Sequence, residues 1–129
     1  MTVLLLDDDP DQISLRSMLL KHAGFTPVAA RDPAAALRLA VHEKPICAVV
    51  DLRVPTERAG LQFIRDLKRL QPSIPVIVLS GGDPSRLYQM PEKELIAGVL
   101  IKGAPARGLL EMLASFTGAG CARSAAAHP

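Results

Sequence analysis

The chain has 129 residues, which is enough for one domain with its own core and too few for two. It is 49% hydrophobic and 22% charged, which is typical of a globular protein. Its 15 Lys and Arg residues nearly balance its 13 Asp and Glu residues and do not cluster, so charge gives no reason to expect binding to nucleic acid or to an acidic membrane surface. These features exclude the disordered, fibrous and strongly basic classes of protein.

Five short, mainly apolar segments predict five β-strands. The segments are Val3–Leu6, Thr26–Ala30, Ile46–Val50, Val76–Leu79 and Ala97–Ile101. They are continuous rather than alternating in hydrophobicity, which is typical of parallel strands that are covered on both faces. Longer segments with helical features separate them, so strand and helix alternate five times. This order predicts an α/β fold, a doubly wound parallel sheet with five helices distributed over both faces.

Asp-Pro pairs predict the starts of three helices. In Asp9-Pro10, Asp32-Pro33 and Asp83-Pro84, we expect the Asp to cap the helix and the Pro to take the first helical position. The first of these helices should end near Gly24, because glycine suits a helix C-terminus.

The positions of proline and of apolar residues predict where the remaining helices begin, break and end. The helix that starts after Asp83 should break near Met90, since an interior proline removes a hydrogen bond, and Pro91 should open a second short piece through Glu94. Two further helices are predicted from apolar spacing, the first of them ending before Pro72. Their apolar faces carry Leu61, Ile64, Leu67 and Leu70 in the first and Leu109, Leu113 and Phe116 in the second.

The cysteines and the chain ends bear on location and on domain boundaries. Cys47 lies in an apolar segment and is expected to be a buried free thiol, and Cys121 has no cysteine nearby, which favours a reducing compartment. We find no signal peptide and no apolar segment long enough to span a bilayer, so we expect a cytoplasmic protein. Residues 1–117 are predicted to form the domain, and residues 118–129 a flexible tail or linker stub.

Polar residues stand at the ends of four predicted strands. They are Asp7 and Asp8 after the first strand, Asp51 after the third, Ser80 after the fourth and Lys102 after the fifth. In an open parallel sheet the carboxyl ends of the strands border the ligand crevice. We therefore expect these side chains to converge on one pocket.

Three carboxylates in one pocket repel one another, by about 4 kcal/mol per pair at about 4 Å with an effective dielectric constant near 20. A hard divalent cation with oxygen ligands removes this conflict, and Mg²⁺, or Mn²⁺ in its place, suits carboxylates and phosphate. The charges of the three carboxylates, one Mg²⁺ and Lys102 sum to zero, and the lack of His and Cys in this set argues against zinc. Such a pocket suits phosphoryl transfer to a carboxylate nucleophile.

Four sequence blocks carry a resemblance to a known family. The blocks are Leu4–Pro10 (LLLDDDP), Val49–Pro55 (VVDLRVP), Val76–Gly81 (VIVLSG) and Val99–Lys102 (VLIK). In this order and spacing they resemble the signature motifs of response-regulator receiver domains, over about Val3 to Phe116. The resemblance implies a flavodoxin-like sheet with strand order 2-1-3-4-5, and a signalling phosphoacceptor that assists its own phosphorylation and dephosphorylation rather than an enzyme.

The resemblance also implies roles for the residues at the strand ends. Asp51 would be the phosphoacceptor of a two-component phosphorelay, Ser80 the switch hydroxyl, and Lys102 a partner of the phosphoryl group. The implied metal ligands are Asp7, Asp8, Asp51 and the main-chain carbonyl of Arg53. The implied partners are a histidine kinase or histidine phosphotransfer protein as donor, and a downstream protein or fused output domain, with no nucleic acid bound by this domain alone and no membrane.

Four positions depart from the family pattern. Gly103 stands where many receivers have proline, and Val99 replaces an aromatic residue that responds to phosphorylation. Thr56–Ala59 is predicted to be a loop one residue longer than usual. Arg53, at a position that tunes the lifetime of the phosphoryl group, is either a solvated loop residue or a gate over the phosphate. Because Val99 has no ring to turn, we expect the signal to be read as reordering of residues 83–96.

Two other functions fit parts of the sequence. A haloacid-dehalogenase-like phosphatase would use Asp7 and Asp9 in its first motif, Val76–Gly81 as its second and Lys102 in its third. That function needs a further acidic pair after the lysine and leaves Asp51 without a role. The other alternative is a receiver that signals by docking alone, independently of phosphorylation. The full acidic set and Lys102 argue against it, and Val99 and Gly103 leave it open.

Overall fold

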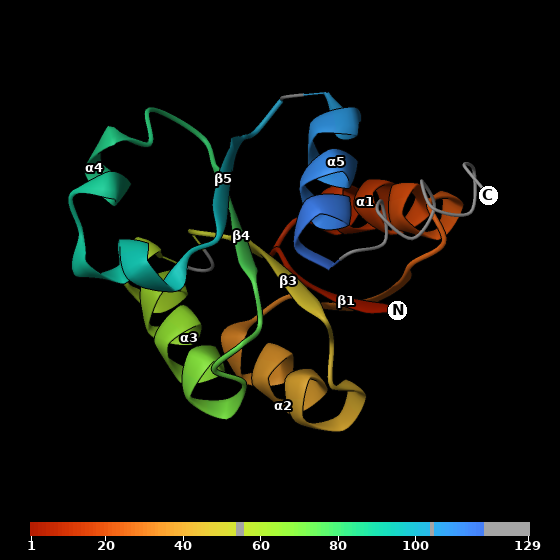
Figure 1. Ribbon diagram of the computed structural model, residues 1–129, viewed down its shortest axis with the longest axis horizontal. Coiled ribbons are helices and arrows are strands. Elements are labelled where there is room, and N and C mark those ends of the chain that lie inside the picture. Colours follow the sequence, from red (N-terminus) through yellow and green to blue (C-terminus); the bar gives the residue numbers. More distant parts are fainter. Residues whose placement is uncertain (54–55, 104, 118–129) are drawn as a thin grey trace.

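Five parallel strands form the centre of the structure, a computed structural model that describes residues 1–53, 56–103 and 105–117. The strands are β1 (Thr2–Leu6), β2 (Thr26–Ala30), β3 (Cys47–Asp51), β4 (Val76–Ser80) and β5 (Gly98–Ile101). Their hydrogen-bonded order is β2-β1-β3-β4-β5 (Figure 1). The predicted fold class and strand order are therefore confirmed.

Helices cover both faces of this sheet. α1 and α5 lie on one face, α2 and α3 lie on the other, and α4 with the short 3₁₀ helix η1 lies on the same side as α3 (Figure 1). The helices are α1 (Pro10–His22), α2 (Pro33–Glu43), α3 (Glu57–Leu70), α4 (Ser85–Tyr88), η1 (Pro91–Leu95) and α5 (Ala106–Thr117).

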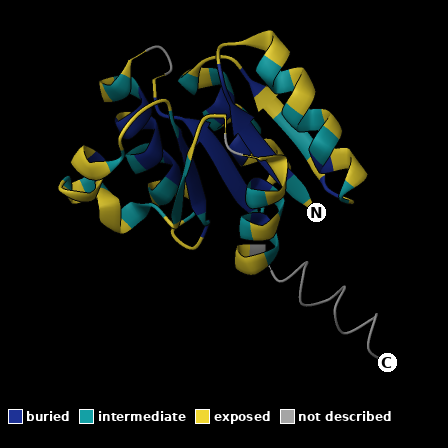
Figure 2. Ribbon diagram, turned by 90° about the horizontal axis from the view of Figure 1, so that it is seen from above, coloured by how far each residue is buried: buried dark blue, intermediate teal, exposed yellow. Residues whose placement is uncertain are grey.

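Alternate residues of the central strands belong to separate cores on the two faces. In β1, Leu4 and Leu6 pack toward α2 and α3, whereas Val3 and Leu5 pack toward α1 and α5. Buried residues therefore run almost without interruption along β1, β3 and β4 (Figure 2). This double burial is the reason that the strand segments are continuously apolar. The edge strands β2 and β5 are only partly buried.

Two of the three Asp-Pro pairs start helices as predicted. The Asp9 carboxylate accepts a hydrogen bond from the main-chain N–H of Asp11 at 2.9 Å, and that of Asp32 accepts one from the N–H of Ala35 at 2.9 Å. In both cases the following proline is the first residue of the helix. The first helix also ends as predicted, with Gly24 at a φ of 91° just beyond α1.

The third Asp-Pro prediction was wrong in its detail. α4 begins at Ser85, so Pro84 precedes the helix instead of opening it. The Asp83 carboxylate accepts hydrogen bonds from the N–H of Ser85 at 2.9 Å and from its hydroxyl at 2.6 Å, which lowers the pKa of Asp83. These local bonds hold the pair in a turn before the helix. The predicted break before Pro91 is confirmed, because α4 ends at Tyr88 and η1 begins at Pro91.

Helix α3 ends at Leu70, before Pro72 as predicted, but it differs from its prediction at its start and in the exposure of its last leucine. Thr56 accepts a hydrogen bond from the N–H of Ala59 at 3.1 Å and caps α3, so the predicted loop is the cap and first turn of the helix. At the other end Leu70 is 50% exposed, because it lies in the last turn at the margin of the buried stripe. Phe63, which was not predicted to face the core, is buried. In α5, Leu109 and Leu113 are buried as predicted, whereas Phe116 near the end of the helix is exposed.

Cys47 is a buried free thiol, as predicted, and its burial raises the pKa of the thiol to about 12. Cys121 and the predicted tail of residues 118–129 lie outside the described residues. Among the helices that the structure describes, none has both the length and the apolar character that crossing a membrane requires.

Gly60 lets α3 approach the end of β3 closely. A Cβ atom at this position would lie 2.0 Å from the main-chain oxygen of Leu52, the residue after Asp51. We predict that Gly60→Ala lowers the free energy of unfolding by about 1–3 kcal/mol, because the helix must move away from the backbone. Urea denaturation measures the change.

Gly108→Ala is the matched control for this prediction, since Gly108 also lies in a helix but a Cβ there meets only Leu100 Cδ2 at 3.8 Å. It should raise stability by about 0.5–1 kcal/mol, because alanine loses less backbone entropy than glycine. Equal stabilities of the two variants would contradict the close packing of α3 on Leu52.

Candidate functional site

The strand ends converge as predicted. Asp51 and Ser80 are the last residues of β3 and β4, Asp7 follows β1, and Lys102 follows β5. Carboxylate oxygens of Asp7, Asp8 and Asp51 lie within 4.8 Å of one another. We call these three residues the acidic cluster. Three carboxylates at this separation repel one another strongly, so the cluster needs cations.

Asp7 is buried and paired on both of its carboxylate oxygens. Asp7 is 3% exposed. Its Oδ1 accepts a hydrogen bond from the N–H of Asp9 at 2.9 Å, and its Oδ2 forms an ion pair with Arg16 of α1. The Arg16 side chain is 12% exposed. Sequence analysis missed Arg16, although it lies four residues before buried Leu20 and so on the inner face of α1.

Asp51 is held by a second cation. The residue is 4% exposed, and its Oδ2 accepts a hydrogen bond from Lys102 Nζ at 2.6 Å. Its Oδ1 accepts a longer bond, 3.2 Å, from the N–H of Arg53. A carboxylate with this little exposure is compatible with the fold only when it is paired, and Lys102 supplies the partner.

Ser80 lies on the wall of the cavity next to Asp51. A cavity of about 260 Å³ is lined by Asp51, Ser80 and Lys102 among other residues. The Ser80 hydroxyl donates to the carbonyl of Gly82 at 3.2 Å, and its main-chain oxygen accepts from the N–H of Lys102 at 2.7 Å. The hydroxyl is therefore bonded within its own loop and borders the space in which a ligand of Asp51 would lie.

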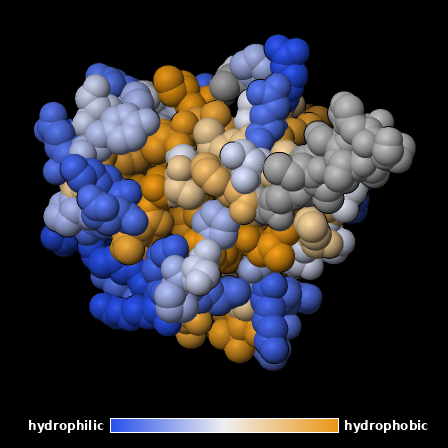
Figure 3. Space-filling model, in the orientation of Figure 1, coloured by the Kyte–Doolittle hydropathy of each residue, from blue (hydrophilic) through white to orange (hydrophobic). Residues whose placement is uncertain are grey.

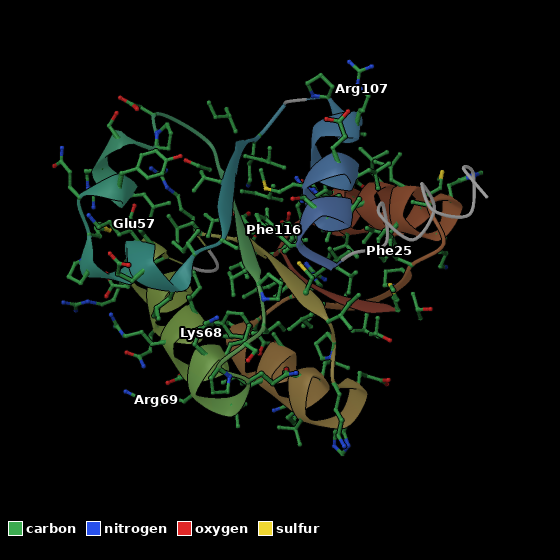
Figure 4. The ribbon with its side chains drawn as sticks, viewed as in Figure 1. Phe25, Glu57, Lys68, Arg69, Arg107 and Phe116 are labelled. Atoms are coloured by element: carbon green, nitrogen blue, oxygen red, sulfur yellow. The ribbon has the colours of Figure 1, made fainter. Side chains whose placement is uncertain are left out.

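The rim of this cavity contains residues that sequence analysis did not single out. Glu57, at the start of α3 and labelled in Figure 4, forms an ion pair with Arg86 of α4 at 2.6 Å. Both residues line the cavity. Arg53, which sequence analysis did single out, also lines it and is exposed. The two members of the ion pair are 29 positions apart, so no local sequence pattern points to it.

The acidic cluster suits a hard divalent cation. Its side-chain donors are carboxylate oxygens, with no imidazole or thiolate, and two of the three carboxylates are buried. In the described part of the chain, Arg16 and Lys102 are the cations that form ion pairs with the cluster, and three carboxylates and two cations leave a net charge of −1. Mg²⁺ prefers oxygen ligands of this kind. The oxygen donors and the net negative charge of the acidic cluster therefore both fit a Mg²⁺ ion.

The phosphatase alternative fits this geometry less well. It requires Asp9 to act beside Asp7, but the carboxylate of Asp9 is bonded to the first turn of α1 and is not part of the acidic cluster. Asp51, which that function leaves unused, lies within the cluster.

Comparison with known sequences identifies relatives over most of the chain. The family of the response regulator receiver domain matches residues 3–114. Transcriptional regulatory protein GlrR of Escherichia coli (strain K12) is 36% identical over 79 residues, which are 61% of this chain and 18% of GlrR. Probable transcriptional regulatory protein TcrX of Mycobacterium tuberculosis is 32% identical over 82 residues, 64% of this chain and 35% of TcrX. The chain thus matches only a minor part of each relative's length.

Solved structures share the fold. A response regulator receiver domain protein from Clostridium thermocellum superimposes with a TM-score of 0.82 and 21% identity, covering 91% of this chain and 94% of that one. Chemotaxis protein CheY4 of Vibrio cholerae gives a TM-score of 0.81 and 24% identity, covering 89% of this chain and 97% of that one. At these identities the likeness shows the fold alone.

Metal titration of two neighbouring substitutions tests the composition of the acidic cluster. We predict that Asp8→Ala weakens Mg²⁺ binding about tenfold or more, because one carboxylate charge beside a divalent ion is lost. Asp9→Ala should leave Mg²⁺ affinity nearly unchanged and lower the free energy of unfolding by about 1 kcal/mol, because it removes a helix cap. Calorimetry measures the first effect and urea denaturation the second. Equal losses of Mg²⁺ affinity would mean that the acidic pair is placed one residue out of register.

Proposed function

Because the chain belongs to the response regulator receiver domain family of two-component signalling systems, we propose that it accepts one phosphoryl group on Asp51. The observation that carries this proposal is the buried Asp51 carboxylate, which lies with Asp7 and Asp8 and is bonded to Lys102. The proposed donor is a histidine kinase or a histidine phosphotransfer protein.

In the proposed reaction an oxygen of the Asp51 carboxylate forms a bond to phosphorus. The N–P bond of the donor phosphohistidine breaks, and its electron pair stays on the imidazole nitrogen. The product is an acyl phosphate on Asp51. The geometry supports Asp51 over Asp7, because Asp51 lines the cavity that Ser80 and Lys102 also line, whereas Asp7 does not line it.

Lys102 and Ser80 would act on the transferred group. Lys102 is bonded to Asp51 and would neutralise phosphoryl oxygens as charge builds on them. The Ser80 hydroxyl would exchange its bond to the carbonyl of Gly82 for a bond to a phosphoryl oxygen, since it already lines the same cavity. Such positioning and charge stabilisation are most of what phosphoryl transfer requires from a protein.

The proposed metal is Mg²⁺, with Mn²⁺ as a substitute. Asp7, Asp8, Asp51 and the main-chain carbonyl of Arg53 would hold it, and the bound ion supplies charge neutralisation for the carboxylates and the phosphoryl oxygens. The N–H of Arg53 is bonded to Asp51, which keeps its backbone next to the acidic cluster.

We propose that residues 1–117 act as the receiver unit of a signalling pathway in the cytoplasm. The transcriptional regulators that are similar to it are several times longer than the matched segment, which supports a fused output domain or a separate downstream protein. The free thiol of Cys47 agrees with a reducing compartment. The alternative of docking without phosphorylation would use the same face, and phosphorylation assays separate the two functions.

Phosphorylation by acetyl phosphate tests the proposed function directly. We predict that the chain gains one phosphoryl group when Mg²⁺ or Mn²⁺ is present and none when the metal is chelated. Asp51→Asn should abolish the gain, because an amide cannot form the acyl phosphate. Intact mass spectrometry measures the product.

Asp9→Asn is the matched control, because asparagine also caps helices and the same charge is removed from outside the acidic cluster. It should be phosphorylated like the unchanged chain. An Asp51→Asn variant that still gains phosphate with the same yield would refute the assignment of the phosphoacceptor, and an inert unchanged chain would favour docking alone.

The segment between β4 and β5 is suited to report the phosphorylated state. α4 has four residues and η1 has five, and both are joined to α3 by ion pairs, Arg86 to Glu57 and Glu92 to Arg65. Beneath them a cavity of about 150 Å³ is lined by Leu87, Ile96 and Val99 among others. β5, which is partly exposed, lies where hydrophobic side chains gather on the surface (Figure 3). Short helices over a cavity open at low free-energy cost.

Hydrogen exchange tests whether this segment carries the signal. We predict that beryllofluoride, a mimic of the bound phosphoryl group, changes protection in residues 83–96 more than in α2, because the segment adjoins Ser80 and α2 lies at the other end of the sheet. Mass spectrometry after exchange with and without beryllofluoride and Mg²⁺ measures this. Unchanged protection in residues 83–96, with increased protection around Asp51, would contradict the proposed readout.

A further inference from the structure

Arg16 places a fixed positive charge in the interior of the candidate site. Its guanidinium forms an ion pair with Asp7 Oδ2, and its side chain is nearly as buried as the carboxylate that it contacts. An arginine keeps its charge at any physiological pH even when it is buried, whereas a buried lysine or histidine can lose its proton. Arg16 therefore contributes one positive charge to the site in every state of the chain.

Arg16 and Lys102 approach the acidic cluster from a shared side. Both line a cavity of about 480 Å³ between α1 and α5, together with Gln12 and several leucines. Lys102 contacts Asp51, which lines the cavity of about 260 Å³ beside Ser80. Arg16 contacts Asp7, which does not line that cavity. Each of the two cations therefore pairs with a different carboxylate of the acidic cluster.

The charge of Arg16 changes which state of the site is neutral. With both cations counted, the acidic cluster carries a net charge of −1, and one Mg²⁺ brings it to +1. A dianionic acyl phosphate in place of the Asp51 carboxylate adds one negative charge, so the phosphorylated site with its metal is neutral. Without Arg16 the neutral state would be the metal-bound, unphosphorylated site.

We propose that Arg16 is a resident counterion that weakens Mg²⁺ binding to the unphosphorylated site and stabilises the charge of the phosphoryl group. This inference rests on the proposed function and extends it to a residue outside the strand ends. Arg16 is a positioning residue for Asp7 and also a source of electrostatic potential. The first role alone would make the loss of Arg16 harmful to metal and phosphoryl binding alike, because Asp7 would lose its orientation. The second role gives the two ligands opposite responses.

Two titrations of Arg16→Gln on the whole chain test the proposal. Calorimetric titration with Mg²⁺ alone should show binding about tenfold tighter than in the unchanged chain, because a positive charge next to a divalent ion has been removed. Titration with beryllofluoride at saturating Mg²⁺ should show binding weaker by a similar factor. Arg16→Lys keeps the charge and should shift both affinities far less than the glutamine substitution. Lys21→Gln, which removes an exposed charge from the last turn of α1, should shift neither.

Each outcome decides between the two roles of Arg16. Opposite shifts of Mg²⁺ and beryllofluoride affinity support the counterion. Weaker binding of both ligands, or no change in either, overturns it and leaves Arg16 a structural partner of Asp7. Thermal melts in the absence of Mg²⁺ check that Arg16→Gln is folded. If it is not folded, the two titrations are made with Arg16→Met, which also removes the charge, and are compared with those of Arg16→Lys and of the unchanged chain. An unchanged chain that binds neither ligand would refute the proposed function itself, and this inference with it.

Discussion

The mutual repulsion of three carboxylates is the constraint on which the rest of the site depends. Asp7, Asp8 and Asp51 are brought together because parallel strands end at one edge of the sheet, and two of the three are then buried. Buried carboxylates require cations, and the chain supplies Arg16 from α1 and Lys102 from the end of β5. These two cations leave one negative charge uncompensated, so this edge of the sheet attracts a divalent cation.

The sequence was sufficient to predict those features of the fold and site that depend on a few consecutive residues. Strands that are buried on both faces must be apolar throughout, so Val76–Leu79 and its counterparts could be recognised from a few consecutive residues. A polar residue at the end of such a strand must lie at the edge of the sheet, which is why the positions of Asp51 and Lys102 in the sequence were enough to predict that they meet. Pro91 is equally local in its effect, since a missing N–H interrupts a helix in any surroundings.

Interactions between distant segments leave no such local pattern in the sequence. The partners of the Glu57–Arg86 ion pair come from different helices, and each side chain alone resembles an ordinary surface charge. Arg16 could have been noticed from its place on the inner face of α1, but only the structure pairs it with Asp7. The helix start at Asp83-Pro84 was misplaced for a different, local reason, because the Asp83 carboxylate binds both the N–H and the hydroxyl of Ser85 in a turn before the helix.

The alternation of β1 residues between two cores has a consequence for how such a chain can diversify. Leu4 and Leu6 belong to one hydrophobic cluster, Val3 and Leu5 to another, and the sheet backbone separates them. Each half of the molecule can therefore be repacked, in evolution or in the laboratory, with little disturbance of side-chain packing in the other half. The polar edge receives residues from both halves, with Arg16 from one helical layer and Glu57 from the opposite one. Side chains in the two layers can thus change independently while residues from both still meet at one polar edge.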